Sequence, residues 1–236
     1  MTRLHHFENC FSTNDEILSV LNEDESTAVF TFNQTKGRGQ YGNIWKVHPN
    51  ENLAYSLALK TSKVIISDTF LNYYTAIIVR DFLANLTNAN AKIKWPNDII
   101  LNGKKVCGIL IEKKKMNHEE YYIIGIGINV LQSDFSNLPK AGSVLSVTGL
   151  SFDLNQFVTE FHQYLISKIE DIDSEEIILN TYNHSLFRKD EISVFQKNNL
   201  RQNGIIKNAD KNGFLWIDLE NDGLQKFFHK EIELLY

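Results

Sequence analysis

The chain has 236 residues, of which 24 are Lys or Arg and 29 are Asp or Glu, giving a formal net charge of −5. Hydrophobic residues at 43% and charged residues at 22% are ordinary globular values, which exclude a disordered chain, a collagen-like chain and a coiled-coil rod. The mildly acidic balance also argues against a general nucleic-acid-binding protein.

Cysteine content and the N-terminal segment indicate the compartment. Cys10 and Cys107 are too few for a disulfide framework or a four-sulfur zinc site. The N-terminus has no apolar run typical of a secretory signal, and the longest nearly apolar stretch, 123–131, is too short to span a bilayer. The seven His lack metal-ligand spacing, so we expect no protein-bound metal. We therefore expect a cytoplasmic protein without a membrane partner.

The first predicted elements alternate between helix and strand. Thr13 and Glu16 have the spacing of a capping box at the start of a helix. Residues 27–33 predict a strand, and strict alternation over 53–59 predicts a half-buried strand. Apolar residues at helical spacing over 71–82 predict a helix with one apolar face.

The remaining elements divide the chain near residue 188. Before it, strands are predicted at 93–95, 99–101, 105–112 and 121–130, and helices at 157–169 and 175–187. After it, short strands at 191–196, 204–207, 214–219 and 226–228 are joined by tight turns, which is typical of a small β-barrel. We expect two domains, residues 1–187 and 188–236.

The first chemical pattern is a glycine-rich segment, Gly37-Arg38-Gly39 followed by Gly42. It formally matches a dinucleotide fingerprint, but no helical pattern follows it, which excludes a Rossmann turn. Glycines allow backbone N–H groups to approach an anion, and Arg38 adds a bidentate donor for carboxylate or phosphate. The alternative is a flexible surface loop.

The second pattern is Lys92-Ile93-Lys94-Trp95-Pro96-Asn97-Asp98. In an extended segment Lys92 and Lys94 share one face while Trp95 lies on the other, and Pro96 keeps Trp95 extended. This arrangement holds the Lys94 ammonium at a rigid strand end. A strand with two solvated lysines is the alternative.

The third pattern places glycines inside apolar strands, at Gly108 and at Gly125 and Gly127, with Asn129 at the end. Strand glycines often mark the close approach of a ligand. The Asn129 amide could match the donor and acceptor edge of a nucleobase. Two tightly packed strands would give the same pattern.

In this order the patterns resemble the biotin–protein ligase family, also called biotin–[acetyl-CoA-carboxylase] ligases. The matching strings are Ser12-Thr13-Asn14, Gln34-Thr35-Lys36-Gly37-Arg38-Gly39, Lys94-Trp95-Pro96-Asn97-Asp98, Lys105-x-x-Gly108-Ile109-Leu110-x-Glu112 and Gly125-x-Gly127-x-Asn129. The resemblance implies an α+β fold, with a mixed-sheet, class II synthetase-like catalytic domain and a C-terminal SH3-like barrel.

The resemblance implies a two-step reaction. Biotin attacks the α-phosphate of ATP, giving biotinyl-5′-AMP, and a lysine of a biotin carboxyl carrier domain then takes the biotin. Mg²⁺ would arrive with the triphosphate. Fixed cations suit the charge that develops in such a transfer.

The resemblance also assigns residues to these substrates. Lys94 and Arg38 would be catalytic. The residues implied to bind biotin are Ser12, Thr13, Asn14, Gln34, Arg38, Gly39, Gln40, Lys94 and Gly108. Those implied to bind ATP are Gly37, Arg38, Trp45, Asn97, Lys105 and Asn129, with Trp45 covering the nucleotide.

Two departures from the family pattern modify these expectations. Gln40, Tyr41 and Asn43 occupy loop positions that are often basic, so we hypothesise that the adenylate is held less electrostatically here. Only eleven residues precede Ser12, which predicts a form without the DNA-binding domain of ligase–repressors.

Other readings remain. A lipoate ligase or octanoyl transferase shares the fold, and a non-catalytic biotin sensor could be built on it. Sequence alone leaves the oligomeric state open between a monomer and a sheet-edge homodimer.

Overall fold

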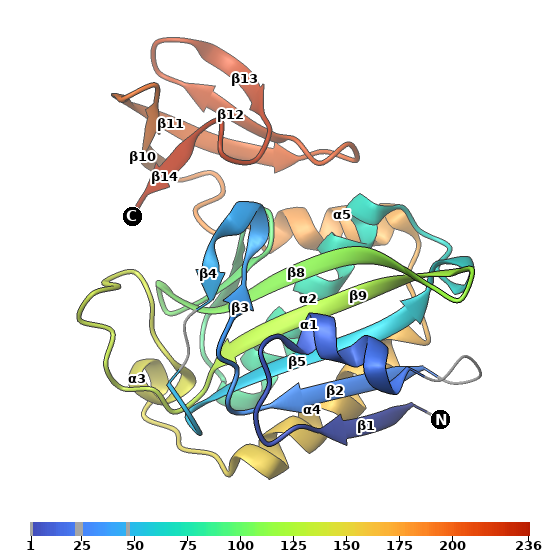
Figure 1. The fold of residues 1–236 in the computed structure, drawn as a ribbon. Helices are drawn as coiled ribbons and strands as arrows, with labels where there is room; N and C mark the ends of the chain where they lie inside the picture. Colours follow the sequence, from blue (N-terminus) through green and yellow to red (C-terminus); the bar gives the residue numbers. More distant parts are fainter. Residues whose placement is uncertain (1, 22–25, 46–47) are drawn as a thin grey trace.

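A seven-stranded sheet forms the body of the protein in the computed structural model, which describes residues 2–21, 26–45 and 48–236 (Figure 1). Its order is β1-β2-β5-β9-β8-β7-β6. The strands are β1 (Arg3–His6), β2 (Thr27–Thr31), β5 (Asn52–Lys60), β6 (Ala91–Lys94), β7 (Asp98–Leu101), β8 (Lys104–Met116) and β9 (Glu119–Asn129). β1 and β2 are parallel and the other neighbours are antiparallel, so the predicted mixed sheet is confirmed.

The two faces of this sheet are covered differently (Figure 1). The long helices α2 (Asp68–Thr87), α4 (Leu154–Ile169) and α5 (Glu175–His184) lie on one face. The other face carries α1 (Thr13–Glu16) and the small hairpin of β3 (Gly37–Arg38) and β4 (Ile44–Trp45). The remaining elements are η1 (Ile17–Val20), η2 (Gln40–Gly42), η3 (Thr61–Lys63) and α3 (Val144–Thr148).

Strand β5 is buried on both faces along most of its length, so the half-buried strand predicted from its alternation is wrong. Leu53, Tyr55 and Leu57 belong to the core beneath the helices. The small residues between them face α1: Ser56 bonds to α1 side chains, and Ala58 packs with Ile17. Alternation therefore records a change from large to small side chains, not from buried to exposed.

Helix α2 likewise differs from its prediction. Buried residues occur around most of its circumference, including Phe70, Tyr73, Ala76 and Ile77 in addition to the predicted apolar face. The helix is enclosed because it contacts β6, α4 and α5 together.

The N-terminal helix begins where expected but lacks the predicted capping box. Ser12 occupies the N-cap position and makes no side-chain capping hydrogen bond. The Thr13 hydroxyl instead bonds to Gln34 and Ser56. After one turn the helix tightens into η1.

The C-terminal segment forms a five-stranded antiparallel sheet of order β13-β12-β11-β10-β14. Its strands are β10 (Ile192–Lys197), β11 (Leu200–Ala209), β12 (Leu215–Leu219), β13 (Gly223–Phe227) and β14 (Glu233–Leu235). Within residues 188–236, all of which are described, β13 and β14 are the two edges and do not pair. The sheet is thus open, and a closed barrel is not observed.

One hydrophobic cluster continues from the body into this sheet, where it includes Phe195, Ile206 and Leu215. Backbone bonds between Ile93 and both Ser185 and Phe187 fix the segment that leads to β10. The domain boundary at 187/188 remains a prediction. Among the described helices, none combines the length and apolar character needed to cross a membrane.

Candidate functional site

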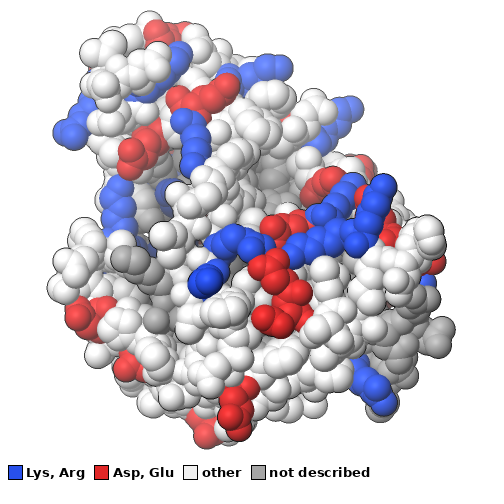
Figure 2. Space-filling model, in the orientation of Figure 1, with Lys and Arg blue, Asp and Glu red and all other residues white. Residues whose placement is uncertain are grey.

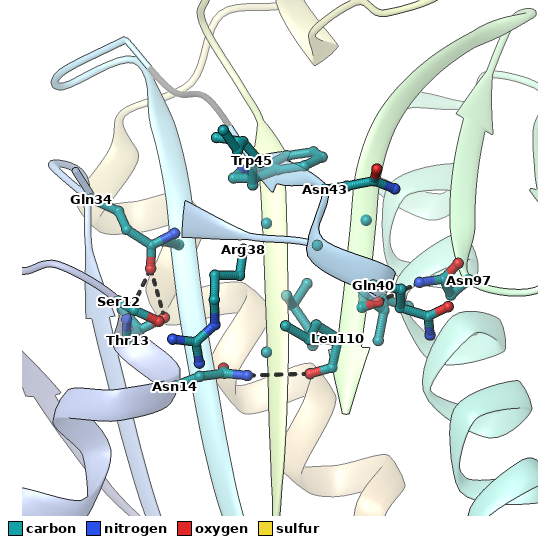
Figure 3. A pocket seen from close by; sticks show the side chains of 18 of the residues that line it. Ser12, Thr13, Asn14, Gln34, Arg38, Gln40, Asn43, Trp45, Asn97 and Leu110 are labelled. Atoms are coloured by element: carbon teal, nitrogen blue, oxygen red, sulfur yellow. Dashed lines mark hydrogen bonds between the residues drawn. The ribbon is translucent and has the colours of Figure 1, made fainter. Parts of the chain in front are cut away.

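The segments singled out in the sequence meet on the sheet face that carries α1. A cavity of about 120 Å³, here called the glycine-loop cavity, lies beneath residues 37–45. Its lining includes Ser12, Thr13, Asn14, Gln34, Arg38, Gly39, Gln40, Trp45, Asn97, Lys105 and Gly108. Figure 3 shows these side chains converging from α1, the β3–β4 hairpin and the central strands. Most of the residues expected to bind biotin are therefore neighbours.

A second cavity of about 800 Å³, the lysine cavity, adjoins the first. Its lining includes Lys94, Lys105, Asn129, Gln132, Phe135 and Tyr236. Ile44, Trp45, Asp98 and Lys105 line both cavities. The structure thus separates Lys94 from Arg38, because Lys94 lines the lysine cavity whereas Arg38 lines the glycine-loop cavity.

Neutral hydrogen-bonding groups form one end of the glycine-loop cavity. Gln34 Oε1 accepts from the Thr13 backbone N at 2.8 Å and from its hydroxyl at 3.2 Å. Ser56 lies within 2.8 Å of the Thr13 hydroxyl and 2.6 Å of Asn14 Oδ1. The Asn14 amide also donates to Glu112 at 2.8 Å. Asn14 is therefore fully engaged within the protein and organises this end of the cavity.

The Arg38 guanidinium forms ion pairs with two carboxylates. Figure 3 shows its side chain pointing toward Asn14. Its guanidinium donates to both Asp15 oxygens, at 2.6 and 3.0 Å, and reaches Glu112 at 3.2 Å. The Arg38 hydrogen bond lowers the pKa of Asp15 to about 2, and Lys114 contributes in the same direction. On the face shown in Figure 2, basic side chains accordingly lie against acidic ones.

Lys94 has no such partner. Its side chain is half-buried at the end of β6, and it makes no hydrogen bond or ion pair with any described residue. The ring centroid of Tyr236 lies 5.8 Å from its ammonium. Burial lowers the pKa of Lys94, an effect that the charge of Asp98 opposes. An unpaired ammonium in a cavity is a natural position for an anion.

Trp45 forms the wall between the two cavities. Its indole lies over Gly108 and Gly127: a Cβ at Gly127 would meet the indole nitrogen at 2.6 Å, and one at Gly108 would meet the ring at 3.1 Å. These two strand glycines therefore provide space for the Trp45 ring, whereas the sequence predicted the close approach of a ligand. The indole N–H is buried and has no hydrogen-bond partner among the residues that the structure describes.

The remaining sequence-predicted residues have structural partners. Asn97 donates to the Ile109 carbonyl, and Asn129 Nδ2 donates to Gly142 at 3.0 Å. Lys105 forms an ion pair with Asp98 at 2.7 Å and lies 5.6 Å from the Trp45 ring. Gly37 is packed against Gln34 and Trp45, where a Cβ would lie 2.6 Å from Gln34 Nε2.

Sequence reasoning missed several residues of this region. Ser56 is a fully buried polar residue inside an apolar strand, a signal that the alternating pattern contained. The buried Asn52–Gln132 bond of 2.7 Å and the placement of His229 in the glycine-loop cavity had no local signal. Both depend on contacts between distant segments. Among the described residues, no cluster of His, Cys, Asp and Glu could hold a metal ion.

Characterised relatives match part of the chain. The Bacillus subtilis bifunctional ligase/repressor BirA is 36% identical over 137 residues, which is 56% of this chain and 42% of the relative. A biotin–[acetyl-CoA-carboxylase] ligase of Paracoccus denitrificans is 32% identical over 62% of this chain and 65% of its own length. The chain thus matches less than two thirds of the length of these relatives.

The fold and a family model extend this similarity. The structure of the Aquifex aeolicus biotin protein ligase, in complex with biotin and ATP, matches with a TM-score of 0.80 and 22% identity, covering 99% of this chain and 98% of that one. The model of the Biotin/lipoate A/B protein ligase family matches residues 9–129, which include the glycine loop, Lys94 and Asn129. The chain therefore belongs to the Biotin/lipoate A/B protein ligase family.

Proposed function

We propose that the protein is a biotin–protein ligase, which forms biotinyl-5′-AMP from biotin and ATP and transfers the biotin to a lysine of a biotin carboxyl carrier domain. The main structural support for this proposal is the pair of adjoining cavities. One ends in neutral hydrogen-bonding groups at Thr13 and Gln34, and the other contains the unpaired ammonium of Lys94.

The glycine-loop cavity suits the ureido ring of biotin. This ring is uncharged and offers two N–H donors and one carbonyl acceptor, which hydroxyl and amide groups complement. Ser12 is buried, and its hydroxyl makes no hydrogen bond to another described residue, so it is available to a ligand. The cavity is smaller than the roughly 300 Å³ at which ligand pockets begin, so the glycine loop must shift to admit biotin.

The lysine cavity suits the nucleotide. Asn129, at its edge, keeps its amide oxygen for the adenine amino group while Nδ2 bonds to Gly142. Lys94 and Lys105 supply positive charge where biotin's carboxylate would meet the α-phosphate. Cations fixed before the reaction stabilise developing negative charge without reorganisation. Mg²⁺ would be carried by the phosphates, which is its usual mode of binding.

Arg38 has a conditional role in this proposal. To reach the acyl phosphate it must leave Asp15 and Glu112, so these carboxylates hold it in reserve until an anion competes for it. Tyr41, at a loop position that is often basic in the family, does not line the glycine-loop cavity, and its carbonyl accepts a hydrogen bond from Lys230. The SH3-like character of the C-terminal sheet belongs to this proposal as well.

Incubation with ATP, Mg²⁺, biotin and a carrier domain tests the function, with the mass of the carrier as the readout. Biotin attachment without lipoate attachment is expected. Lipoate attachment would favour the lipoate–protein ligase alternative, and biotin binding without any adenylate would favour a sensor.

Lys94→Ala separates catalysis from folding. We expect biotin-dependent exchange of labelled pyrophosphate into ATP to fall by about 10²–10³-fold, as when a charge-stabilising donor is removed. Lys92→Ala is the matched control, because Lys92 lies on the same strand and is absent from both cavities. Full exchange activity in Lys94→Ala, or an equal loss in Lys92→Ala, would contradict the assignment.

A further inference from the structure

His229 places a residue of the C-terminal sheet over the glycine-loop cavity. It follows β13 and lines two further cavities: one of about 580 Å³ that it shares with Lys94, and one of about 310 Å³, here called the α2 cavity. The lining of the α2 cavity includes Gln40, Tyr41, Asn72, Glu112, Phe228 and His229. Its ring centroid lies 4.9 Å from that of Tyr41 and 5.8 Å from that of Trp95. Lys230 fixes the same loop by donating to the Tyr41 carbonyl at 3.2 Å.

The imidazole is held by ring contacts and has no hydrogen-bond partner among the described residues. Its Nδ1 is buried and unpaired, a costly state in a folded protein. A catalytic role is one of the explanations for a buried polar atom that lacks a partner in a native structure. His229 and Gln40 are shared by the glycine-loop and α2 cavities, so His229 lies between the expected biotin position and a separate approach from the surface.

The α2 cavity provides that approach. Its lining comes from α2, β8 and the C-terminal segment, and it shares no lining residue with the lysine cavity. Tyr41 and Phe228 line it and are 56% and 45% exposed, so two aromatic rings are available to a protein segment. An acceptor lysine entering through this cavity would meet His229 where it borders the glycine-loop cavity, in which we place biotin.

We propose that His229 is the general base of the transfer step, a role that rests on the proposed ligase function. The neutral lysine amine attacks the acyl carbon of biotinyl-5′-AMP. As the C–N bond forms, the nitrogen becomes cationic and its proton passes to the imidazole of His229. The bond between the acyl carbon and the phosphate oxygen then breaks, AMP leaves with the electron pair, and the imidazolium releases its proton to solvent.

The surroundings of His229 favour a neutral imidazole. Burial lowers the pKa of His229, and the charges of Lys94, Lys230 and Lys105 lower it further, whereas Asp98 opposes them. Since the ordinary histidine pKa is about 6.5, the ring is uncharged at neutral pH and can accept a proton.

The test separates the two half-reactions in His229→Gln. Transfer from preformed adenylate to the carrier should fall by roughly 10²-fold or more at pH 7, well beyond any accompanying loss of biotin-dependent pyrophosphate exchange. The deficit should shrink as pH rises. Transfer to hydroxylamine, a weakly basic nucleophile that needs little base assistance, should be unaffected, and added imidazole should restore transfer in His229→Ala.

His184→Gln is the matched control, because His184 is exposed at the end of α5 and lines neither of these two cavities. Unchanged carrier transfer in His229→Gln would overturn the proposal, as would parallel losses with lysine and hydroxylamine or a parallel loss of pyrophosphate exchange. Exchange activity also reports that the variant is folded. If the unmodified protein formed no adenylate, the ligase function itself would fail, which is a distinct outcome.

Discussion

At the scale of single residues, the site is defined by which charges are paired. Arg38 is bound by two carboxylates, whereas Lys94 has no ionic partner among the described residues. The strand position of Lys94 was predictable because alternation and Pro96 fix its direction. The pairing of Arg38 with Asp15 was not, because α1 and the glycine loop meet only in the folded chain.

The Arg38–Asp15 pair predicts a pH effect on stability. The pKa of Asp15 is lowered to about 2 by the Arg38 hydrogen bond, from an ordinary value near 4. A carboxyl group whose pKa is lower in the folded state than in the unfolded state stabilises the protein at pH values above the unfolded-state pKa. This stabilisation is lost as the pH falls through the folded-state pKa. The unfolding free energy should therefore decrease less steeply between about pH 4 and pH 2 in Asp15→Asn than in the unmodified protein. The unfolding free energy would be measured by urea titration at each pH. The same dependence on pH in both proteins would refute this contribution.

At the scale of elements, glycines in β8 and β9 determine where the indole of Trp45 lies. The sequence predicted close approach at these glycines but could not say what approaches. The answer, Trp45, comes from a hairpin more than sixty residues earlier in the chain. The same is true of β5. The alternation of its residues can be read from the sequence, but the position of α1, which buries its second face, cannot.

Substituting these glycines should displace Trp45 to different extents. In Gly127→Ala the new Cβ would overlap the indole nitrogen at 2.6 Å, so Trp45 must move and the KM for ATP should rise by about tenfold, a cost of roughly 1.4 kcal/mol. Gly108→Ala is the milder control, since its Cβ would lie 3.1 Å from the ring edge. Steady-state kinetics and tryptophan fluorescence would measure both changes. Equal effects of the two substitutions would contradict this account.

At the scale of the whole molecule, the C-terminal sheet is connected to the body by side-chain contacts as well as by the backbone. Asn183, at the end of α5, accepts from the Ala209 backbone N at 2.7 Å and donates to the Ala209 carbonyl at 3.0 Å. Tyr73 donates to the Asp210 carbonyl at 3.2 Å. The shared hydrophobic cluster adds to these bonds, so the two parts should unfold together.

Removing the Asn183 side chain tests this coupling. Asn183→Ala removes the acceptor of the Ala209 backbone N–H, whereas the Ala209 carbonyl keeps the hydrogen bond that Asn208 donates at 3.2 Å. The loss of the N–H partner should cost about 1–3 kcal/mol. We expect the unfolding of Trp216, in β12, to separate from that of the body in denaturant titrations. Asn180→Ala, on the same helix, serves as the control. A single unchanged transition in Asn183→Ala would show that the hydrophobic contacts suffice.

The sequence alone indicated which residues form the candidate site and the type of most elements, because periodicity, turn residues and short strings of polar residues are local properties. It indicated the glycine loop, the lysine at the end of β6 and the central strand β9. Only the tertiary structure decided how these groups are arranged: Lys94 and Arg38 line separate cavities, Trp45 lies between them, and His229 enters from the C-terminal sheet. These relations depend on contacts between segments far apart in the chain, and local patterns carry no information about such contacts.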